Sequence, residues 1–322
     1  MKYRKLGNSS LKVSCLGIGG NIFGKFCNQQ ETGEILNAAY QAGINFVDVA
    51  DVYSEGKAEE FVGKVIGENR KKWIIATKVG AYSNESFSGK GRRAYIFSSI
   101  EGSLRRLKTD YIDLYQMHSF DPTTPIGETL EALAALVKAG KILNAGISNY
   151  DADHLRSALQ LTEDSNYRVL YSAQYPYNLF KRDIENGIMQ LCKKFGLGII
   201  IYGALARGVL SEKYRIKQEI PRDSRAFGSQ SIKSDLTEEV LSVAEKLEQF
   251  AKHLNRTVNE LAIAWILHKS EVSSVLIGVR NTAQLSGNIS ALDFVLSDSE
   301  LLEIDKIVGD LGRFKKVSLG AF

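Results

Sequence analysis

The feature that most constrains the fold of this chain is a regular alternation of short apolar runs with longer amphipathic segments. Few of the runs alternate polar with apolar residues. Continuous hydrophobic runs are expected of parallel strands that are buried on both faces of the sheet. We count eight runs, at residues 15–18, 45–48, 73–77, 112–116, 142–146, 169–173, 197–201 and 274–277.

Segments with helical periodicity lie between these predicted strands. Asp151 is the expected N-cap of one helix, because its carboxylate can accept from the first free backbone N–H groups. Gly43, Gly140 and Gly196 follow three other helices, where glycine suits the left-handed residue that ends a helix. The predicted helices cover residues 32–42, 59–67, 94–107, 126–138, 151–160, 182–195 and 236–253.

Eight β/α units in a chain of 322 residues predict an α/β fold, a (β/α)8 TIM barrel. Such a barrel typically takes about 250 residues, so the chain has a surplus. No break in composition marks a boundary, and residues 1–322 are expected to form a single barrel domain. The surplus is assigned to an N-terminal β-hairpin (residues 2–13), a long loop insertion (203–235), extra C-terminal helices (283–291 and 298–308) and a mobile or barrel-covering tail (311–322).

Composition excludes several functional classes. The net charge is only +4, and Lys and Arg are dispersed along the chain, which argues against nucleic-acid binding. No run of about 18 apolar residues suits a membrane span, and the N-terminus lacks the apolar core of a signal peptide. Cys15, Cys27 and Cys192 are widely spaced, which predicts reduced thiols, no metal site and a cytoplasmic location.

Polar side chains follow three neighbouring strands at the ends that meet in the mouth of a barrel. Asp48 ends the second strand and Tyr53 follows it, Lys78 ends the third strand, and His118 follows the fourth. A buried lysine between a carboxylate and a phenol is expected to lower the pKa of the phenol. These four side chains therefore predict a site that transfers protons.

Asp48 and Lys78 also have possible structural roles, and two dehydrogenase motifs are matched only in part. Taken singly, Asp48 suits a helix cap and Lys78 a charge at the barrel rim. Tyr53-x-x-x-Lys57 matches a signature of short-chain dehydrogenases, but it stands early in the chain with Gly56 inside it, and Lys57 is expected to be exposed. Residues 17–22 approach a Rossmann fingerprint and lack its third glycine.

Six motifs in order along the chain resemble those of the aldo-keto reductases: GINFVDVADVY (43–53), ATKVG (76–80), DYIDLYQMH (110–118), LVKAGKILNAGISNY (136–150), SAQYPYNLFKR (172–182) and IIIYGALARGVL (199–210). The resemblance implies a barrel that binds NADPH, less often NADH, and reduces a small aldehyde or ketone to an alcohol. The catalytic tetrad of that family falls on Asp48, Tyr53, Lys78 and His118. Tyr53 would give the proton, and His118 would orient the carbonyl.

The resemblance also implies a set of cofactor ligands. Ser148, Asn149 and Gln174 would hold the nicotinamide carboxamide, with Tyr202 stacked on the ring and Asp48 beside it. Arg280 would bind the 2′-phosphate, because its planar guanidinium suits phosphate. The remaining expected ligands are Gly20, Asn21, Gly203, Leu205, Arg207, Gly278, Gln284 and Asn288.

Departures from the family pattern leave two questions open. Gly203 and Ala204 stand where the family commonly has Ser-Pro, and Gly287 replaces an acidic residue, so the preference for NADP over NAD is not fixed. A regulatory subunit that binds the cofactor with little turnover is the alternative function.

The physiological substrate and the direction of the reaction are also undetermined. A sugar or sugar derivative is one candidate for the substrate, since Arg207 suits an anionic compound. Aromatic side chains of the mouth loops are candidates for the pocket lining: Phe23, Phe26, Tyr82 and Phe120.

Overall fold

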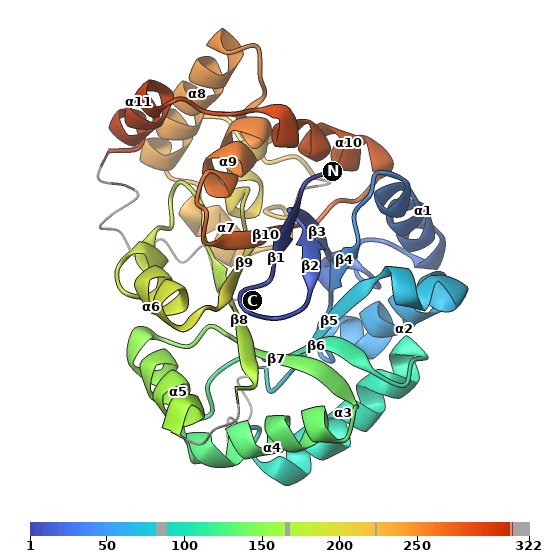
Figure 1. The fold of residues 1–322 in the computed structure, drawn as a ribbon. Helices are drawn as coiled ribbons and strands as arrows, with labels where there is room; N and C mark the ends of the chain where they lie inside the picture. Colours follow the sequence, from blue (N-terminus) through green and yellow to red (C-terminus); the bar gives the residue numbers. More distant parts are fainter. Residues whose placement is uncertain (82–88, 165–167, 223, 310, 312–322) are drawn as a thin grey trace.

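The chain folds around a closed barrel of eight parallel strands, shown in Figure 1 for the computed structural model. The structure describes residues 1–81, 89–164, 168–222, 224–309 and 311. The strands pair in the order β10-β3-β4-β5-β6-β7-β8-β9, and β9 pairs with β10 to close the barrel. Their bounds are β3 (Leu16–Gly19), β4 (Phe46–Asp48), β5 (Ile74–Val79), β6 (Ile112–Met117), β7 (Ile142–Ser148), β8 (Leu170–Pro176), β9 (Gly198–Tyr202) and β10 (Val272–Ile277). The predicted (β/α)8 fold is confirmed.

Helices surround the strands (Figure 1). Asp151 Oδ1 accepts the backbone N–H of His154 at 2.8 Å, as expected of an N-cap. Gly43, Gly140 and Gly196 have φ values of 83°, 70° and 71°, which confirms the predicted helix ends. The helices are α1 (Gln29–Gln41), α2 (Lys57–Ile66), α3 (Arg93–Leu107), α4 (Ile126–Lys138), α5 (Ala152–Asp164), α6 (Ile188–Phe195), α7 (Gln230–Asp235), α8 (Glu238–His253), α9 (Val258–Leu267), α10 (Thr282–Ile289) and α11 (Asp298–Val308).

The strands are apolar on both faces because they contribute to two cores. The larger core lies between the strands and the helices. The smaller one fills the barrel interior and its N-terminal end, and consists of Leu6, Leu11, Val13, Phe46, Ala76, Leu114, Ile200 and Leu276.

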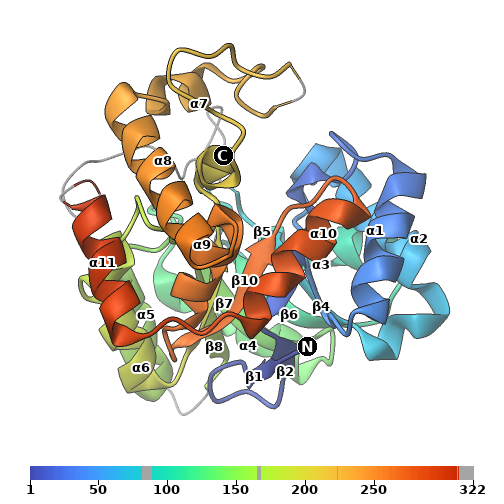
Figure 2. The same cartoon turned by 90° about the horizontal axis from the view of Figure 1, so that it is seen from above.

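The N-terminal hairpin closes one end of the barrel, as Figure 2 shows. Strands β1 (Tyr3–Lys5) and β2 (Lys12–Ser14) pair antiparallel, which confirms the predicted hairpin. The Arg4 guanidinium donates to the carbonyl oxygens of Leu267 (2.6 Å) and Lys269 (3.0 Å), near the start of β10. Gly7 in the turn has a φ of 53°, and a Cβ there would clash with the backbone of Gly198. The mouth of the barrel is therefore the opposite end.

Two helix predictions need correction. Helix α9 was not predicted, because nearly all of its residues are buried and its sequence VNELAIAWIL has no polar face to reveal a helical period. Residues 182–195 are not one helix: a short 3₁₀ turn at Asp183–Glu185 precedes α6, and Gly187 (φ 103°) separates them.

The expected long loop at residues 203–235 contains a 3₁₀ helix, Ala206–Ser211, and helix α7. The two extra C-terminal helices are confirmed as α10 and α11. The tail predicted at 311–322 lies outside the described residues except for Leu311. In the part of the chain that is described, no helix is both long and apolar enough to cross a membrane. The single-domain assignment stays a prediction.

Candidate active site

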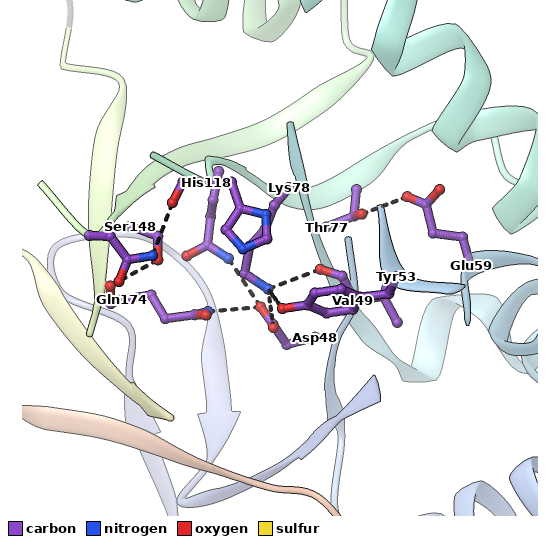
Figure 3. A network of polar contacts seen from close by, with 11 residues as sticks. Asp48, Val49, Tyr53, Glu59, Thr77, Lys78, His118, Ser148 and Gln174 are labelled. Carbon is purple, nitrogen blue, oxygen red and sulfur yellow. Dashed lines mark hydrogen bonds and ion pairs between the residues drawn. The ribbon is translucent and has the colours of Figure 1, made fainter. Parts of the chain in front are cut away.

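The barrel brings the four predicted catalytic side chains together at its mouth (Figure 3). Lys78 Nζ donates to Asp48 Oδ1 and lies 3.4 Å from the Tyr53 hydroxyl. The rings of Tyr53 and His118 meet edge to face, with centroids 5.8 Å apart. Asp48 and Lys78 are almost completely buried, with 2% and 0% of their surface exposed.

Local structure at the strand ends aims these side chains at one point. Asp48 and Lys78 lie in the neighbouring strands β4 and β5, and His118 follows β6 with its backbone N–H bonded to Val79 O at 2.8 Å. Tyr53 opens a 3₁₀ turn in which Ser54 and Glu55 have φ values of 50° and 58°. Left-handed backbone at non-glycine residues costs roughly 1–3 kcal/mol each and is concentrated at functional sites.

The electrostatics of the Lys78–Tyr53 pair differ from the sequence-based expectation. Burial lowers the pKa of Lys78, and the charge and hydrogen bond of Asp48 oppose that change. Burial, followed by the carboxylates of Asp48 and Asp51, raises the pKa of Tyr53 well above its ordinary value. The predicted lowering of the phenol pKa is therefore wrong for this structure, because burial is the largest cause and the negative charges of Asp48 and Asp51 act in the same direction. Tyr53 is a neutral phenol and holds a proton that it can donate.

His118 is neutral as well. Burial, followed by the positive charges of Lys78 and Lys90, lowers the pKa of His118 to about 3. A neutral imidazole can orient a carbonyl through a ring N–H, but it cannot act as a cationic acid near neutral pH. The role of Tyr53 as proton donor stays a prediction.

The residues predicted to hold the nicotinamide carboxamide lie next to the tetrad. Gln174 Nε2 donates to Asp48 Oδ2 at 2.8 Å, and Ser148 Oγ donates to Gln174 O at 3.0 Å. Asn149 Nδ2 donates to His118 O at 3.0 Å, and Asn149 Oδ1 accepts from the Tyr202 hydroxyl at 2.8 Å. These contacts join Ser148, Asn149 and Gln174 to the tetrad; the contact of these three residues with a cofactor stays a prediction.

The other predicted cofactor residues occupy two further segments. Gly203 (φ 69°), Leu205 and Arg207 (φ 56°) lie in the connection after β9, where Arg207 donates to Ser231 Oγ of α7 at 3.1 Å. Gly20 and Asn21 form a 3₁₀ turn after β3, and the side chain of Asn21 lies beside Gly278.

Helix α10 carries the predicted cofactor residues Gln284 and Asn288, and Arg280 lies just before it. The backbone N–H of Arg280 donates to Gln284 Oε1 at 2.9 Å. Asn288 is 4% exposed, and its Oδ1 accepts from Asn259 Nδ2 at 3.2 Å. The Arg280 guanidinium lies over the Phe26 ring, 4.4 Å from its centroid. This ring contact orients the guanidinium.

Sequence reasoning missed three residues of the site. Gln116, inside β6, donates to Asp48 at 3.1 Å. Asp51 is a partly buried carboxyl, and burial and Glu59 raise its pKa to about 6. Burial, followed by the charge of Arg207, lowers the pKa of Arg225, and Arg280 adds to that effect. Gln116 stands in the motif DYIDLYQMH (110–118), two residues before His118, and this spacing is the signal that could have identified it.

One of the aromatic side chains predicted as candidates for the pocket lining needs correction. Phe23 is fully buried in the core, which removes it from the mouth surface. Phe120 stacks on the His154 ring with centroids 3.7 Å apart, and Tyr82 lies outside the described residues. No group of three or more potential metal ligands occurs among the side chains that the structure describes.

The fold and the site define a class of protein: a (β/α)8 barrel with a buried Asp-Lys pair, a buried His and a partly buried Tyr at its mouth. Comparisons with known proteins agree with this class. The family model described as "Aldo/keto reductase family" matches residues 15–309, so the chain belongs to the aldo/keto reductase family, a family of oxidoreductases.

Two relatives match nearly the whole chain. "Aldo-keto reductase YhdN" of Bacillus subtilis (strain 168) is 32% identical over 317 residues, which are 96% of this chain and 94% of the relative. "Probable voltage-gated potassium channel subunit beta" of Oryza sativa subsp. japonica is 34% identical over 305 residues, 92% of each chain. The family thus includes a relative named as a reductase and one named as a channel subunit.

Proposed function

We propose that this protein uses NADPH to reduce an aldehyde or ketone to an alcohol, or catalyses the reverse reaction. The observation that carries the proposal is the buried Asp48–Lys78 pair, in which Lys78 donates to Asp48 and lies 3.4 Å from the Tyr53 hydroxyl. A general acid must reach the atom that it protonates and must hold a proton at the working pH. Tyr53 satisfies the second condition because its pKa is raised.

The residues around Arg225 fit a phosphate-bearing cofactor such as NADP(H). Besides burial, the charges of Arg207 and Arg280 lower the pKa of Arg225, and Arg207 Nη1 lies 4.0 Å from Asp235 Oδ2. Guanidinium groups gathered in this way repel one another, and an anion between them relieves the repulsion. We assign Arg280 to the 2′-phosphate, with Arg207 and Arg225 nearby. NAD(H) is the alternative cofactor.

Each residue of the site then has a chemical task. Bound NADPH would supply the hydride to the carbonyl carbon. The Tyr53 hydroxyl donates its proton to the carbonyl oxygen as negative charge develops there, and Lys78 stabilises the resulting phenolate. The neutral imidazole of His118 orients the carbonyl. Ser148, Asn149 and Gln174 would hold the carboxamide.

The experiment that tests the proposal replaces the proton donor. Tyr53→Phe removes only the hydroxyl, so kcat for a panel of aldehydes and ketones is expected to fall about 10²- to 10⁴-fold. NADPH binding, followed by fluorescence titration, should not change. Tyr40→Phe is the matched control, because Tyr40 packs against Trp73 beside α1 and lies outside the site.

Two outcomes would contradict the proposal. Near-wild-type turnover of Tyr53→Phe would show that Tyr53 is not the donor. Tight NADPH binding by the wild type without turnover of any carbonyl would favour a regulatory subunit. The name of the rice relative fits that alternative without favouring it.

A further inference from the structure

Gln116 is a buried polar side chain in the barrel interior that lies outside the catalytic tetrad. It stands in β6, none of its surface is exposed, and it is two residues before His118. Residues two apart in a strand point to the same side, so Gln116 points inward one layer below the mouth. Branched apolar residues usually fill that interior. A glutamine at this place calls for a specific reason.

The contacts of Gln116 supply that reason. Its Nε2 donates to Asp48 Oδ2 at 3.1 Å, and among the described residues the only other side-chain amide that donates to this oxygen is that of Gln174, at 2.8 Å. Lys78 occupies the other oxygen, Oδ1. Because a carboxylate oxygen only accepts, chemistry requires the NH₂ end of each amide to face Asp48. The two glutamines therefore fix one oxygen, and the other oxygen stays with the lysine.

This arrangement leaves the amide oxygen of Gln116 without a hydrogen-bond donor among the described residues. Within the described residues, Gln116 Oε1 is buried and has no hydrogen-bond partner. A buried acceptor without a donor costs free energy, so the residue is not explained by stability alone. Strand β7 makes the space for it: Gly146 pairs with Gln116, and a Cβ on Gly146 would lie 3.2 Å from Gln116 Cγ and clash with Ser172 Oγ.

We propose that Gln116 is a positioning residue for the catalytic carboxylate. Its amide holds Asp48 Oδ2 so that Oδ1 remains on Lys78. The proposal rests on the proposed function in one respect, the assignment of Gln174 to the nicotinamide carboxamide. When the Gln174 amide turns to that group, Gln116 is the amide that remains on Asp48.

The test compares Gln116→Met with Gln116→Glu. Methionine has a similar length and no donor, so kcat is expected to fall about 10- to 150-fold, the range for a hydrogen bond to a charged group. The Kd for NADPH and the KM for the carbonyl should not change. Glutamate donates only when protonated, so the activity of Gln116→Glu relative to Gln116→Met should rise as the pH falls. A packing role would produce no such dependence.

Ser172→Ala is the matched control. It removes a buried hydroxyl that has no hydrogen-bond partner among the described residues and that flanks Gly146 on the other side. Its kcat should stay at the wild-type value. Wild-type kcat in Gln116→Met would overturn the proposal.

Crystal structures of the wild type and Gln116→Met separate a failure of this inference from a failure of the proposed function. The Asp48 carboxylate is expected to move by about 0.5 Å or more from its wild-type position, whether or not the protein reduces carbonyls. An unmoved carboxylate that keeps the Lys78 contact would overturn the positioning role. Absence of wild-type turnover together with a displaced carboxylate would overturn only the reductase assignment.

Discussion

Asp51→Asn should stabilise the protein near neutral pH and have little effect in acid. Asp51 follows β4 in the turn that leads to Tyr53, and within the described chain its Oδ1 is buried without a hydrogen-bond partner. Burial, followed by the negative charge of Glu59, raises the pKa of Asp51 from 3.8 to about 6. The charges of Arg106 and Lys90 lower it only in part. The folded protein thus holds the proton of Asp51 up to a higher pH than the unfolded chain does.

The sign and size of the effect follow from proton linkage. Between pH about 4 and about 6, the folded state retains a proton that the unfolded chain has released, so stability falls as pH rises through this window. The full cost is present above pH about 6. Two pKa units correspond to about 3 kcal/mol, and partial exposure of the side chain reduces this to roughly 1–2 kcal/mol. Asparagine carries no charge and avoids this cost.

Urea unfolding of wild type and Asp51→Asn across pH 4 to 8 measures the prediction. The variant should be more stable by roughly 1–2 kcal/mol at pH about 7.5, and the difference should shrink towards pH about 4. Asp153→Asn is the control, since the Asp153 side chain is 88% exposed. Loss of stability at pH 7.5, or an equal gain at both pH values, would refute the reasoning.

Three further predictions test the interpretation of the site and the barrel. Lys78→Met should destabilise the protein by about 3–5 kcal/mol in urea unfolding, because it leaves the buried Asp48 carboxylate without its cation; an unchanged midpoint would contradict the ion-pair assignment. Arg280→Leu should weaken NADPH binding about tenfold or more in fluorescence titrations and leave NADH binding unchanged; equal losses for both would place Arg280 away from the 2′-phosphate. Gly146→Ala should cost about 1–3 kcal/mol, because the new methyl group clashes with Ser172 Oγ. Ser172→Gly in the same chain should restore part of that loss, and additive effects would contradict the clash.

The sequence predicted most of the barrel because its strands carry a strong signal. Strands buried on both faces have apolar runs at regular intervals, and the polar residue at the end of a run marks the mouth, as with Asp48 and Lys78. Helix α9 was missed for the opposite reason: it is buried nearly all round, so only its cap was informative. Thr257 and Glu260 form a capping box there, and that pair was a usable signal.

What the sequence could not predict is how strongly burial acts on the site once the strands close. The sequence placed Lys78 between Asp48 and Tyr53 and predicted a lowered phenol pKa, but burial of the phenol and the nearby carboxylates raise the pKa of Tyr53 instead. The same closure brings Gln116 of β6 to Asp48 of β4, across the intervening strand β5. Contacts between non-adjacent strands depend on the tilt of the strands in the barrel, which one strand's sequence does not encode.

The two-residue period of a strand can nevertheless be used on the sequence. The residue two positions before a mouth residue lies in the layer that supports it. In β6 this rule selects Gln116, and in β7 it selects Gly146, which makes the space for it. A polar residue or a glycine in this supporting layer is therefore informative about the catalytic site.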